Sequence, residues 1–261
     1  MTTAAPLVFI TGASSGIGQA LAACFYDGGY RLALVARRTG GIETWAAGRQ
    51  LGAGRYQVYG AGGADTDSIV AAVADCIARQ GVPDVVIANA GISSGIDTAE
   101  RSDLDVLART FAVNNVGLAA TFHPFVQAMV QRGSGRLVGI GSVAAIRGLP
   151  GHGAYCASKA GVVAYCESLR GELHNSGVKV VTLCPGYIDT PLTQGNRYGM
   201  PFLMQPEDFA AQALRAIEAG TSYRVIPWQM GVVAKVMRLL PNAVLDRAVQ
   251  GRARKKRSGE A

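Results

Sequence analysis

An apolar run, Leu7-Val8-Phe9-Ile10, leads directly into the glycine-rich segment Thr11–Gly18, and a helical pattern follows it. A continuous apolar run is typical of a strand buried on both faces of a parallel sheet. Glycines in the turn allow backbone amides to approach a pyrophosphate, and the start of the next helix adds partial positive charge. The order of strand, glycine turn and helix therefore predicts a dinucleotide site. We expect its contacts from Gly12, Ser14, Ser15, Gly16, Ile17 and Gly18.

Seven apolar segments alternate with helical patterns along the chain. Such alternation implies crossover connections, which are typical of a parallel sheet covered by helices on both faces. We expect strands at Leu7–Ile10, Leu32–Ala36, Tyr56–Tyr59, Val85–Ala88, Leu137–Ile140, Val178–Cys184 and Arg224–Pro227. The predicted fold is α/β, a single doubly wound Rossmann domain with a seven-stranded parallel sheet. We place this domain at residues 1–230, and a C-terminal helical extension with a basic tail at residues 231–261.

Tyr155 and Lys159 stand four residues apart in a segment with helical periodicity, Ala154–His174. Residues at i and i+4 share one face of a helix, so the ammonium is expected to favour the ionised form of the phenol. A phenol normally loses its proton near pH 10, and a lower pKa would let Tyr155 exchange a proton with a carbonyl or carbinol oxygen. We expect the hydroxyl of Ser142 to hold that same oxygen.

The ends of the predicted strands carry the residues that point to chemistry. Ligands of a doubly wound sheet bind at the carboxyl ends of its strands. The ends of strands one, two, four, five and six carry Gly12, Arg37, Asn89, Ser142 and Pro185. All of the expected chemistry therefore meets at one edge of the sheet.

Charge and cysteine usage exclude several classes of protein. Residues 235–261 hold 8 basic and 2 acidic residues, which leaves the other 234 residues nearly neutral within a total of +7. This distribution disfavours a broad nucleic-acid surface. The 5 cysteines are scattered without a C-x-x-C pair, and no apolar run is long enough to span a membrane. With a first strand near residue 6 we expect no signal peptide and a cytoplasmic protein. The 3 histidines lack metal-ligand spacing, so we expect no metal.

Six segments together make the chain resemble the short-chain dehydrogenase/reductase family, from about Pro6 to Pro227. They are TGASSGIG at Thr11–Gly18, ANAG at Ala88–Gly91, Asn114 with Gly117, Ser142, YCASK at Tyr155–Lys159, and PGYIDT at Pro185–Thr190. The resemblance implies an oxidoreductase that transfers a hydride between a nicotinamide cofactor and a carbonyl or secondary alcohol. It also implies a catalytic tetrad of Asn114, Ser142, Tyr155 and Lys159, with Asn115 as the alternative to Asn114.

The resemblance further implies which residues contact the cofactor. Asn89, Ala90 and Gly91 would pack against the adenosine ribose, and Pro185, Gly186, Ile188 and Thr190 would frame the carboxamide. Tyr155 and Lys159 would contact the nicotinamide ribose, and Asn114 would help to hold a water beside Lys159.

The end of the second predicted strand bears on the choice of cofactor. A carboxylate there usually binds a free ribose 2′-hydroxyl, but this chain has Arg37 and Arg38. A guanidinium suits a 2′-phosphate, and Ser14 supplies a further donor. We therefore expect NADP(H) rather than NAD(H). The chain departs from the family pattern after the third strand, where Gly62 replaces an Asp that contacts adenine.

The substrate and the partners are less closely defined by the sequence. We expect a lid at Pro191–Gln205 whose apolar second half (Met200, Phe202, Leu203, Met204) favours a hydrophobic substrate, and His152 lies in the loop expected opposite. The family commonly forms dimers or tetramers, here through the helices at 154–174 and 103–132. Alternative functions are a non-catalytic nucleotide-binding regulatory protein and a membrane-peripheral, lipid-directed reductase.

The segment after residue 230 predicts two short helices and a basic end. Gly231–Leu240 shows one apolar stripe, Pro241 interrupts it, and Arg252–Arg257 closes the chain with basic residues. Two interpretations remain open. The stripes cover the substrate pocket or a partner subunit while the basic end stays solvated, or the stripe and the basic cluster rest on an anionic membrane.

Overall fold

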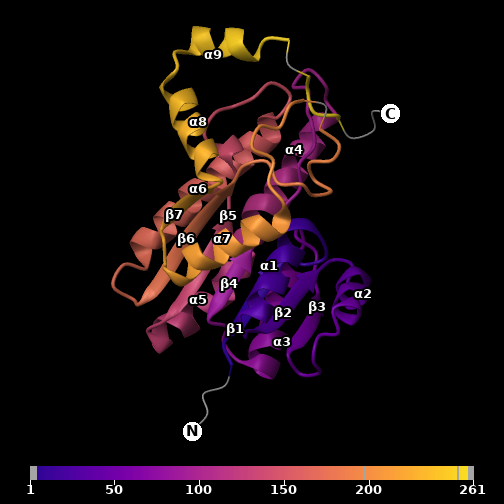
Figure 1. Ribbon diagram of the computed structural model, residues 1–261, viewed down its shortest axis with the longest axis vertical. Helices are drawn as coiled ribbons and strands as arrows, with labels where there is room; N and C mark the ends of the chain where they lie inside the picture. The colour runs from indigo at the N-terminus through magenta and orange to yellow at the C-terminus, as the bar shows by residue number, and fades with distance from the viewer. Residues whose placement is uncertain (1–4, 197, 252, 258–261) are drawn as a thin grey trace.

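A seven-stranded parallel sheet forms the centre of the computed structural model, which describes residues 5–196, 198–251 and 253–257 (Figure 1). Its strand order is β3-β2-β1-β4-β5-β6-β7. The strands are β1 (Leu7–Thr11), β2 (Arg31–Ala36), β3 (Tyr56–Gly60), β4 (Val85–Ala88), β5 (Gly135–Ile140), β6 (Val178–Pro185) and β7 (Tyr223–Ile226). The predicted doubly wound fold is confirmed, and each predicted strand is present with ends that differ by at most a few residues.

Helices cover both faces of this sheet. Their bounds are α1 (Gly16–Asp27), α2 (Gly40–Gly48), α3 (Thr66–Gln80), α4 (Asp103–Phe111), α5 (Gly117–Arg132), α6 (Gly153–Glu172), α7 (Pro206–Glu218), α8 (Trp228–Leu239) and α9 (Asn242–Val249). A π-helical turn, Ala112–Val116, joins α4 to α5, and a 3₁₀ turn, Val143–Ala145, follows β5.

Two buried clusters, one on each face, hold these layers together. One cluster packs α3, α5 and α6 against the sheet, with Val73, Phe122 and Val162 fully buried in it. The other packs α1 and α7 against the opposite face, around Phe25 and Phe209. Side chains alternate between the faces of a strand, so each central strand must be apolar at every position to serve both clusters. In β1 all five residues are buried, and the first four, Leu7–Ile10, are apolar.

The strand order reverses direction between β1 and β4. The chain moves outward from β1 to β2 and β3, then crosses back to pair β4 with β1 before continuing to β7. Crevices for ligands open at such switch points, beyond the carboxyl ends of the strands. Here the residues that follow β1 and β4 are Gly12 and Asn89.

The C-terminal segment begins with a helix that belongs to the body of the domain. Helix α8 starts at Trp228, inside the expected range 1–230, and packs against β7. Gly231 faces Val225 of that strand, and the side chain of Met230 contacts Gly186. Helix α9 lies beyond α8 at one end of the molecule, and the chain then returns toward α4 (Figure 1).

Candidate active site

The glycine turn brings two backbone segments into direct contact. A Cβ on Gly18 would lie 2.1 Å from the carbonyl oxygen of Gly12, so no larger residue fits there. Gly12 and Gly16 have φ values of 67° and 53°, which L side chains rarely adopt. Helix α1 begins beside this turn, and the side chain of its N-cap residue, Ser15, caps none of its amides. The first-turn amides have no intrahelical acceptors either, so this cradle fits a pyrophosphate.

Asn89, which follows β4, fastens the turn to the neighbouring strand. Its side-chain nitrogen donates to the carbonyl oxygens of Thr11 and Gly12 at 3.0 and 3.2 Å. The hydroxyl of Thr11 accepts from the backbone amides of Asn89 and Ala90 at 3.1 and 3.2 Å. These four bonds fix the edge of the crevice at the switch point.

The segment after β6 closes the other side of the turn. A Cβ on Gly16 would meet Thr190 at 3.1 Å, so the predicted carboxamide-framing segment lies against the glycine turn. Ile188 is buried, and the hydroxyl of Thr193 donates to the carbonyl oxygens of Ile188 and Thr190. The segments predicted to contact the cofactor, 12–18, 89–91 and 185–190, therefore lie together at the carboxyl ends of β1, β4 and β6.

Ser142 and Tyr155 line one cavity of about 150 Å³. Ser142 follows β5 in an extended conformation, and its hydroxyl accepts from the amide of Ala144 at 3.1 Å. Tyr155 lies in the first turn of α6. Because both side chains reach the same cavity from different elements, a substrate oxygen there can contact both hydroxyls.

Lys159 lies one turn further along α6 and is 5% exposed. Its ammonium donates to the carbonyl oxygen of Ile140 at 2.8 Å and lies 5.9 Å from the centre of the Tyr155 ring. Burial lowers the pKa of Lys159 to about 8.

The pKa of Tyr155 departs from the sequence-based expectation. Burial of the phenol raises its pKa to about 12, and the neighbouring Ser142 hydroxyl opposes this rise only in part. The expected lowering of the pKa by Lys159 is not found: burial is the largest cause, and the ammonium lies 5.9 Å from the ring centre. The phenol is thus a proton donor at neutral pH.

The π-helical turn Ala112–Val116 turns Asn114 inward, where it is 1% exposed. Such turns often occur at functional sites. Its side-chain oxygen accepts from the amide of Ile92 at 2.9 Å, and its nitrogen donates to the hydroxyl of Ser158 at 2.9 Å. Gly91 separates this oxygen from Lys159: a Cβ there would lie 3.3 Å from the Asn114 oxygen and 3.4 Å from the ammonium. The neighbouring Asn115 donates to the carbonyl oxygen of Ser158 instead.

The residues expected near the adenosine end lie at the end of β2. Arg37 and Arg38 are both exposed, and no ion pair engages either of them within the part of the chain that the structure describes. Ser14 lies beside the start of α2, next to Gly41. Asp65, the acid nearest to Gly62, is occupied as the N-cap of α3, where it accepts from the amide of Ser68 at 3.0 Å.

The cavity walls correct the expected role of the lid. Phe202 and Leu203, expected to make it apolar, are exposed. The lid instead contributes Leu192, Thr193, Asn196, Tyr198 and Pro201, and the expected Arg197 lies outside the described residues. Apolar lining residues also come from the loop expected opposite the lid and from the C-terminal stripe, for which covering the substrate pocket was one of the open interpretations: Ile146, Leu149, Met230, Val233, Ala234 and Met237. The residues of α8 recur at i, i+3, i+4 and i+7, a signal present in the sequence.

His152 connects the loop before α6 to the lid. It lines the cavity, and its Nε2 lies 3.0 Å from the hydroxyl of Tyr198, whose ring packs edge-on against the imidazole. Its Nδ1 lies 3.1 Å from the carbonyl oxygen of Pro150. Both expected roles, loop residue and pocket residue, are therefore present.

The end of the chain, Ala253–Arg257, is here called the tail segment, and it lies against the body rather than in solvent. Arg257 forms an isolated parallel bridge with Gly95, and the amide of Gly95 donates to the carbonyl oxygen of Lys256 at 2.9 Å. Lys255 lines the cavity. The expectation of a solvated basic end is thus wrong for these residues, while Arg252 lies outside the described residues. A run of basic residues in a sequence does not indicate whether the run packs against the folded domain.

The described residues lack two features, a metal cluster and a membrane-spanning helix. They contain no cluster of three metal-ligating side chains. Among their helices, none combines the length and the hydropathy that a membrane crossing needs.

Comparison with known proteins establishes the family. A family model described as short chain dehydrogenase matches residues 6–200. The chain belongs to the short-chain dehydrogenase/reductase family. It is similar to an uncharacterized oxidoreductase of Myxococcus xanthus, with 36% identity over 253 residues that cover 92% of this chain and 95% of the relative. Other relatives are longer, and the chain spans 62% and 33% of two of them.

Solved structures of short-chain dehydrogenases and reductases resemble this one. A 3-ketoacyl-(acyl-carrier-protein) reductase of Brucella melitensis, complexed with NADH, is 26% identical with a TM-score of 0.76, covering 85% of this chain and 96% of the other. An alcohol dehydrogenase of Thermococcus sibiricus, complexed with 5-hydroxy-NADP, is 26% identical with a TM-score of 0.74, covering 85% and 95%. The protein is therefore an oxidoreductase of this family.

Proposed function

We propose that this short-chain dehydrogenase transfers a hydride between NADP(H) and the carbonyl or secondary alcohol of an apolar substrate, with Tyr155 as acid and base. The observation that carries the proposal is the shared cavity of Ser142 and Tyr155. It adjoins the crevice formed by the glycine turn and the segment after β6, where Gly186 contacts Met230 of the cavity wall. A substrate oxygen between the two hydroxyls thus lies next to the proposed nicotinamide position.

The residues divide the work of reduction among them. The bound cofactor supplies the hydride. Tyr155 donates its proton to the substrate oxygen, which also accepts a hydrogen bond from Ser142. With a pKa of about 8, Lys159 is mostly protonated at pH 7, so its charge stabilises the phenolate that remains. The space above Gly91, bordered by Asn114 and Lys159, suits a water that returns a proton to the site.

The apolar walls support a hydrophobic substrate body. Met230, Val233 and Met237 from α8 line the cavity together with Ile146 and Leu149. Apolar walls favour apolar ligands, and a few polar groups orient them. Here Ser142 and Tyr155 are the groups that select an oxygen at the reacting carbon.

Two exposed guanidinium groups support NADP(H) over NAD(H). Arg37 and Arg38 follow β2 and carry no carboxylate partner among the described residues. A 2′-phosphate offers each of them charge-assisted hydrogen bonds. Relatives of known structure bind both kinds of cofactor, so the preference rests on these residues.

The alternative of a non-catalytic nucleotide-binding protein is not favoured. Asn114, Ser142, Tyr155 and Lys159 are all present: Ser142 and Tyr155 line the cavity, and the Asn114 oxygen and the Lys159 ammonium both lie near Gly91. A cytoplasmic location is supported by the cysteines, all five of which are free thiols and four of which are buried.

For assembly, we propose a homodimer or homotetramer that pairs through α4, the π-helical turn and α6. Leu104, Val116 and Tyr165 are large apolar side chains that these elements leave exposed. Helices α4 and α6 contact each other, so the three residues belong to adjoining surfaces. Burying them in a partner would remove apolar surface from water.

For membrane contact, we propose the outer face of α8 rather than the tail segment. Trp228, Val232, Val236 and Leu239 recur at helical spacing and are exposed, Leu239 to 83%. The exposed Lys235 and Arg238 lie beside them. An apolar stripe beside cations suits the surface of an anionic bilayer.

Replacement of Tyr155 by Phe is expected to lower kcat by about 10²–10⁴-fold, because it removes the proton donor of acid–base catalysis. NADPH affinity should stay unchanged. Turnover of ketones by NADPH oxidation and cofactor titration by fluorescence would measure both. Tyr165→Phe, on the same helix but outside the cavity, is the matched control. Near-normal turnover by Tyr155→Phe would refute the assignment.

Arg37→Ala is expected to weaken NADPH binding by about 10- to 100-fold, since it removes a charge-assisted hydrogen bond to the 2′-phosphate. NADH binding should change little. Calorimetric titration of both cofactors would test this, with Arg224→Ala on the far edge strand as control. Equal losses for the two cofactors would show that Arg37 does not bind the phosphate.

The double substitution Leu104→Lys and Val116→Lys is expected to convert the oligomer into monomers, because it places two charges in the proposed interface. Light scattering at micromolar concentration would measure the mass. Leu239→Lys, on α8, is the control and should leave assembly intact. A monomeric unmodified protein would contradict the proposal.

The double substitution Val232→Ser and Val236→Ser is expected to abolish recovery with anionic vesicles in a flotation assay. The unmodified protein should float with anionic but not with neutral vesicles. Val130→Ser, an exposed valine of α5, should leave flotation unchanged. If the unmodified protein stays unbound with both vesicles, the stripe on α8 is not a membrane surface.

A further inference from the structure

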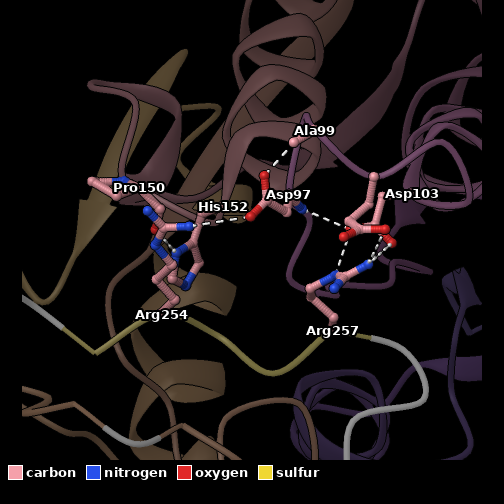
Figure 2. Close-up of polar contacts among 8 residues, drawn as sticks. Asp97, Ala99, Asp103, Pro150, His152, Arg254 and Arg257 are labelled. Carbon is pink, nitrogen blue, oxygen red and sulfur yellow. Dashed lines mark hydrogen bonds and ion pairs between the residues drawn. The ribbon is translucent and has the colours of Figure 1, made fainter.

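Two arginines hold the tail segment against the body (Figure 2). Arg257 pairs with the buried Asp103, with Nε 2.7 Å from Oδ2 and Nη2 3.3 Å from Oδ1. The same carboxylate accepts from the amide of Asp97 at 2.7 Å. Nearer to α9, Arg254 lies 3.5 Å from Asp97. The segment is thus fixed on both sides of Lys255.

Glycine at position 95 lets the tail segment approach this closely. A Cβ on Gly95 would lie 2.1 Å from the carbonyl oxygen of Lys255, so any larger residue would push the segment away. Gly95 follows Ser93 in the loop after β4, which leads from the cofactor crevice to the cavity. The backbone of Lys255 is therefore fastened beside the candidate active site.

The side chain of Lys255 lines the cavity that Ser142 and Tyr155 also line. Its ammonium donates to the hydroxyl of Ser93 at 2.9 Å and to the carbonyl oxygen of Leu192 at 3.3 Å. Both acceptors are neutral. Within the described part of the chain no carboxylate pairs with this lysine, and burial lowers its pKa. Its charge lacks the compensation that a half-buried ammonium normally has.

The other ionisable groups around the cavity do not supply that compensation. The lining contains a second cation, Arg147, whose guanidinium already donates to the carbonyl oxygen of Leu240 and the side-chain oxygen of Asn242. No described lining residue is acidic. The remaining walls are largely apolar, so an anion inside the cavity would meet two cations among the described lining residues: Arg147, whose bonds join it to Leu240 and Asn242, and Lys255, which contacts Ser93 beside the site.

We infer that the substrate carries a carboxylate, and that Lys255 binds this carboxylate while Ser142 and Tyr155 bind the reacting oxygen. The apolar walls hold the body of the molecule between the two ends. The substrate class is therefore an oxo acid or hydroxy acid with an apolar skeleton. The inference rests on the proposed function, because it places the reacting carbon at Tyr155.

The hydrogen bonds of Lys255 leave room for a substrate carboxylate. An ammonium has three donors, of which Ser93 and Leu192 accept two. The bond to Leu192 is the longer, and a carboxylate would accept the third donor or replace that carbonyl. A hydrogen bond between two charged groups is stronger than one to a neutral carbonyl. An ester or amide of the same acid lacks the charge and gains nothing comparable.

The test compares aliphatic oxo acids of increasing chain length with their methyl esters, using the full chain and NADPH oxidation. For the unmodified enzyme, kcat/KM should favour the acid over its ester by about 10- to 100-fold. Lys255→Met should lose that factor for the acid and retain turnover of the ester. Lys255→Arg should keep part of the preference. Lys256→Met, which removes the neighbouring lysine outside the cavity lining, should change neither value.

Several outcomes would overturn the inference. If Lys255→Met loses acid and ester turnover equally, the only role of the lysine is to hold the lid through its bond to Leu192. A parallel fall in NADPH affinity, titrated without substrate, would assign its charge to a phosphate of the cofactor. Equal turnover of acids and esters by the unmodified enzyme would refute the substrate class while leaving the proposed function intact. Absence of turnover with every carbonyl would refute both.

Discussion

The site depends on backbone segments that touch with no side chain between them. Gly18 packs against the carbonyl of Gly12, Gly117 against that of Gly63, and Gly95 against that of Lys255. The first contact shapes the phosphate cradle, the second fixes the π-helical turn that buries Asn114, and the third fastens the tail segment to the cavity. At each place a single methyl group would push the two backbone segments apart by more than a local shift can absorb. The positions of the charged and polar groups at the site therefore depend first on these close backbone contacts.

Two lysines with reduced hydration lie near the reacting position. Lys159 lies behind Tyr155, and Lys255 lies at the wall that the tail segment supplies. Burial of an ammonium costs free energy unless an anion or several acceptors compensate. The ammonium of Lys159 donates to one carbonyl oxygen, and that of Lys255 donates to a hydroxyl and a carbonyl oxygen. In the proposed mechanism, the transient phenolate compensates the charge of Lys159, and the substrate carboxylate compensates that of Lys255. Proton transfer and substrate binding therefore each recover part of the free energy that burial of the lysine costs.

The strands and the motifs that follow them could be predicted from the sequence because their signals are local. A continuous apolar run, a glycine at a fixed offset, and a Tyr-Lys pair on one helix face each depend on a few neighbours. The sequence left open which residues form the walls of the cavity, for the opposite reason. Helix α8 is apolar on two faces, and only its packing on β7 decides that Met230 and Met237 turn inward while Val232 turns outward. The pKa of Tyr155 likewise depends on burial, which spacing along the chain does not encode.

The docked tail segment ties the readiness of the site to the order of synthesis. Residues from β1 to β7 provide the whole sheet, the glycine turn, and the tyrosine and lysine of α6. The wall that contains Lys255 is added only when residues 253–257 have left the ribosome and met Asp97 and Asp103. A chain that ends at residue 250 would keep all seven strands but lack the wall that contains Lys255, so its cavity would be open on that side.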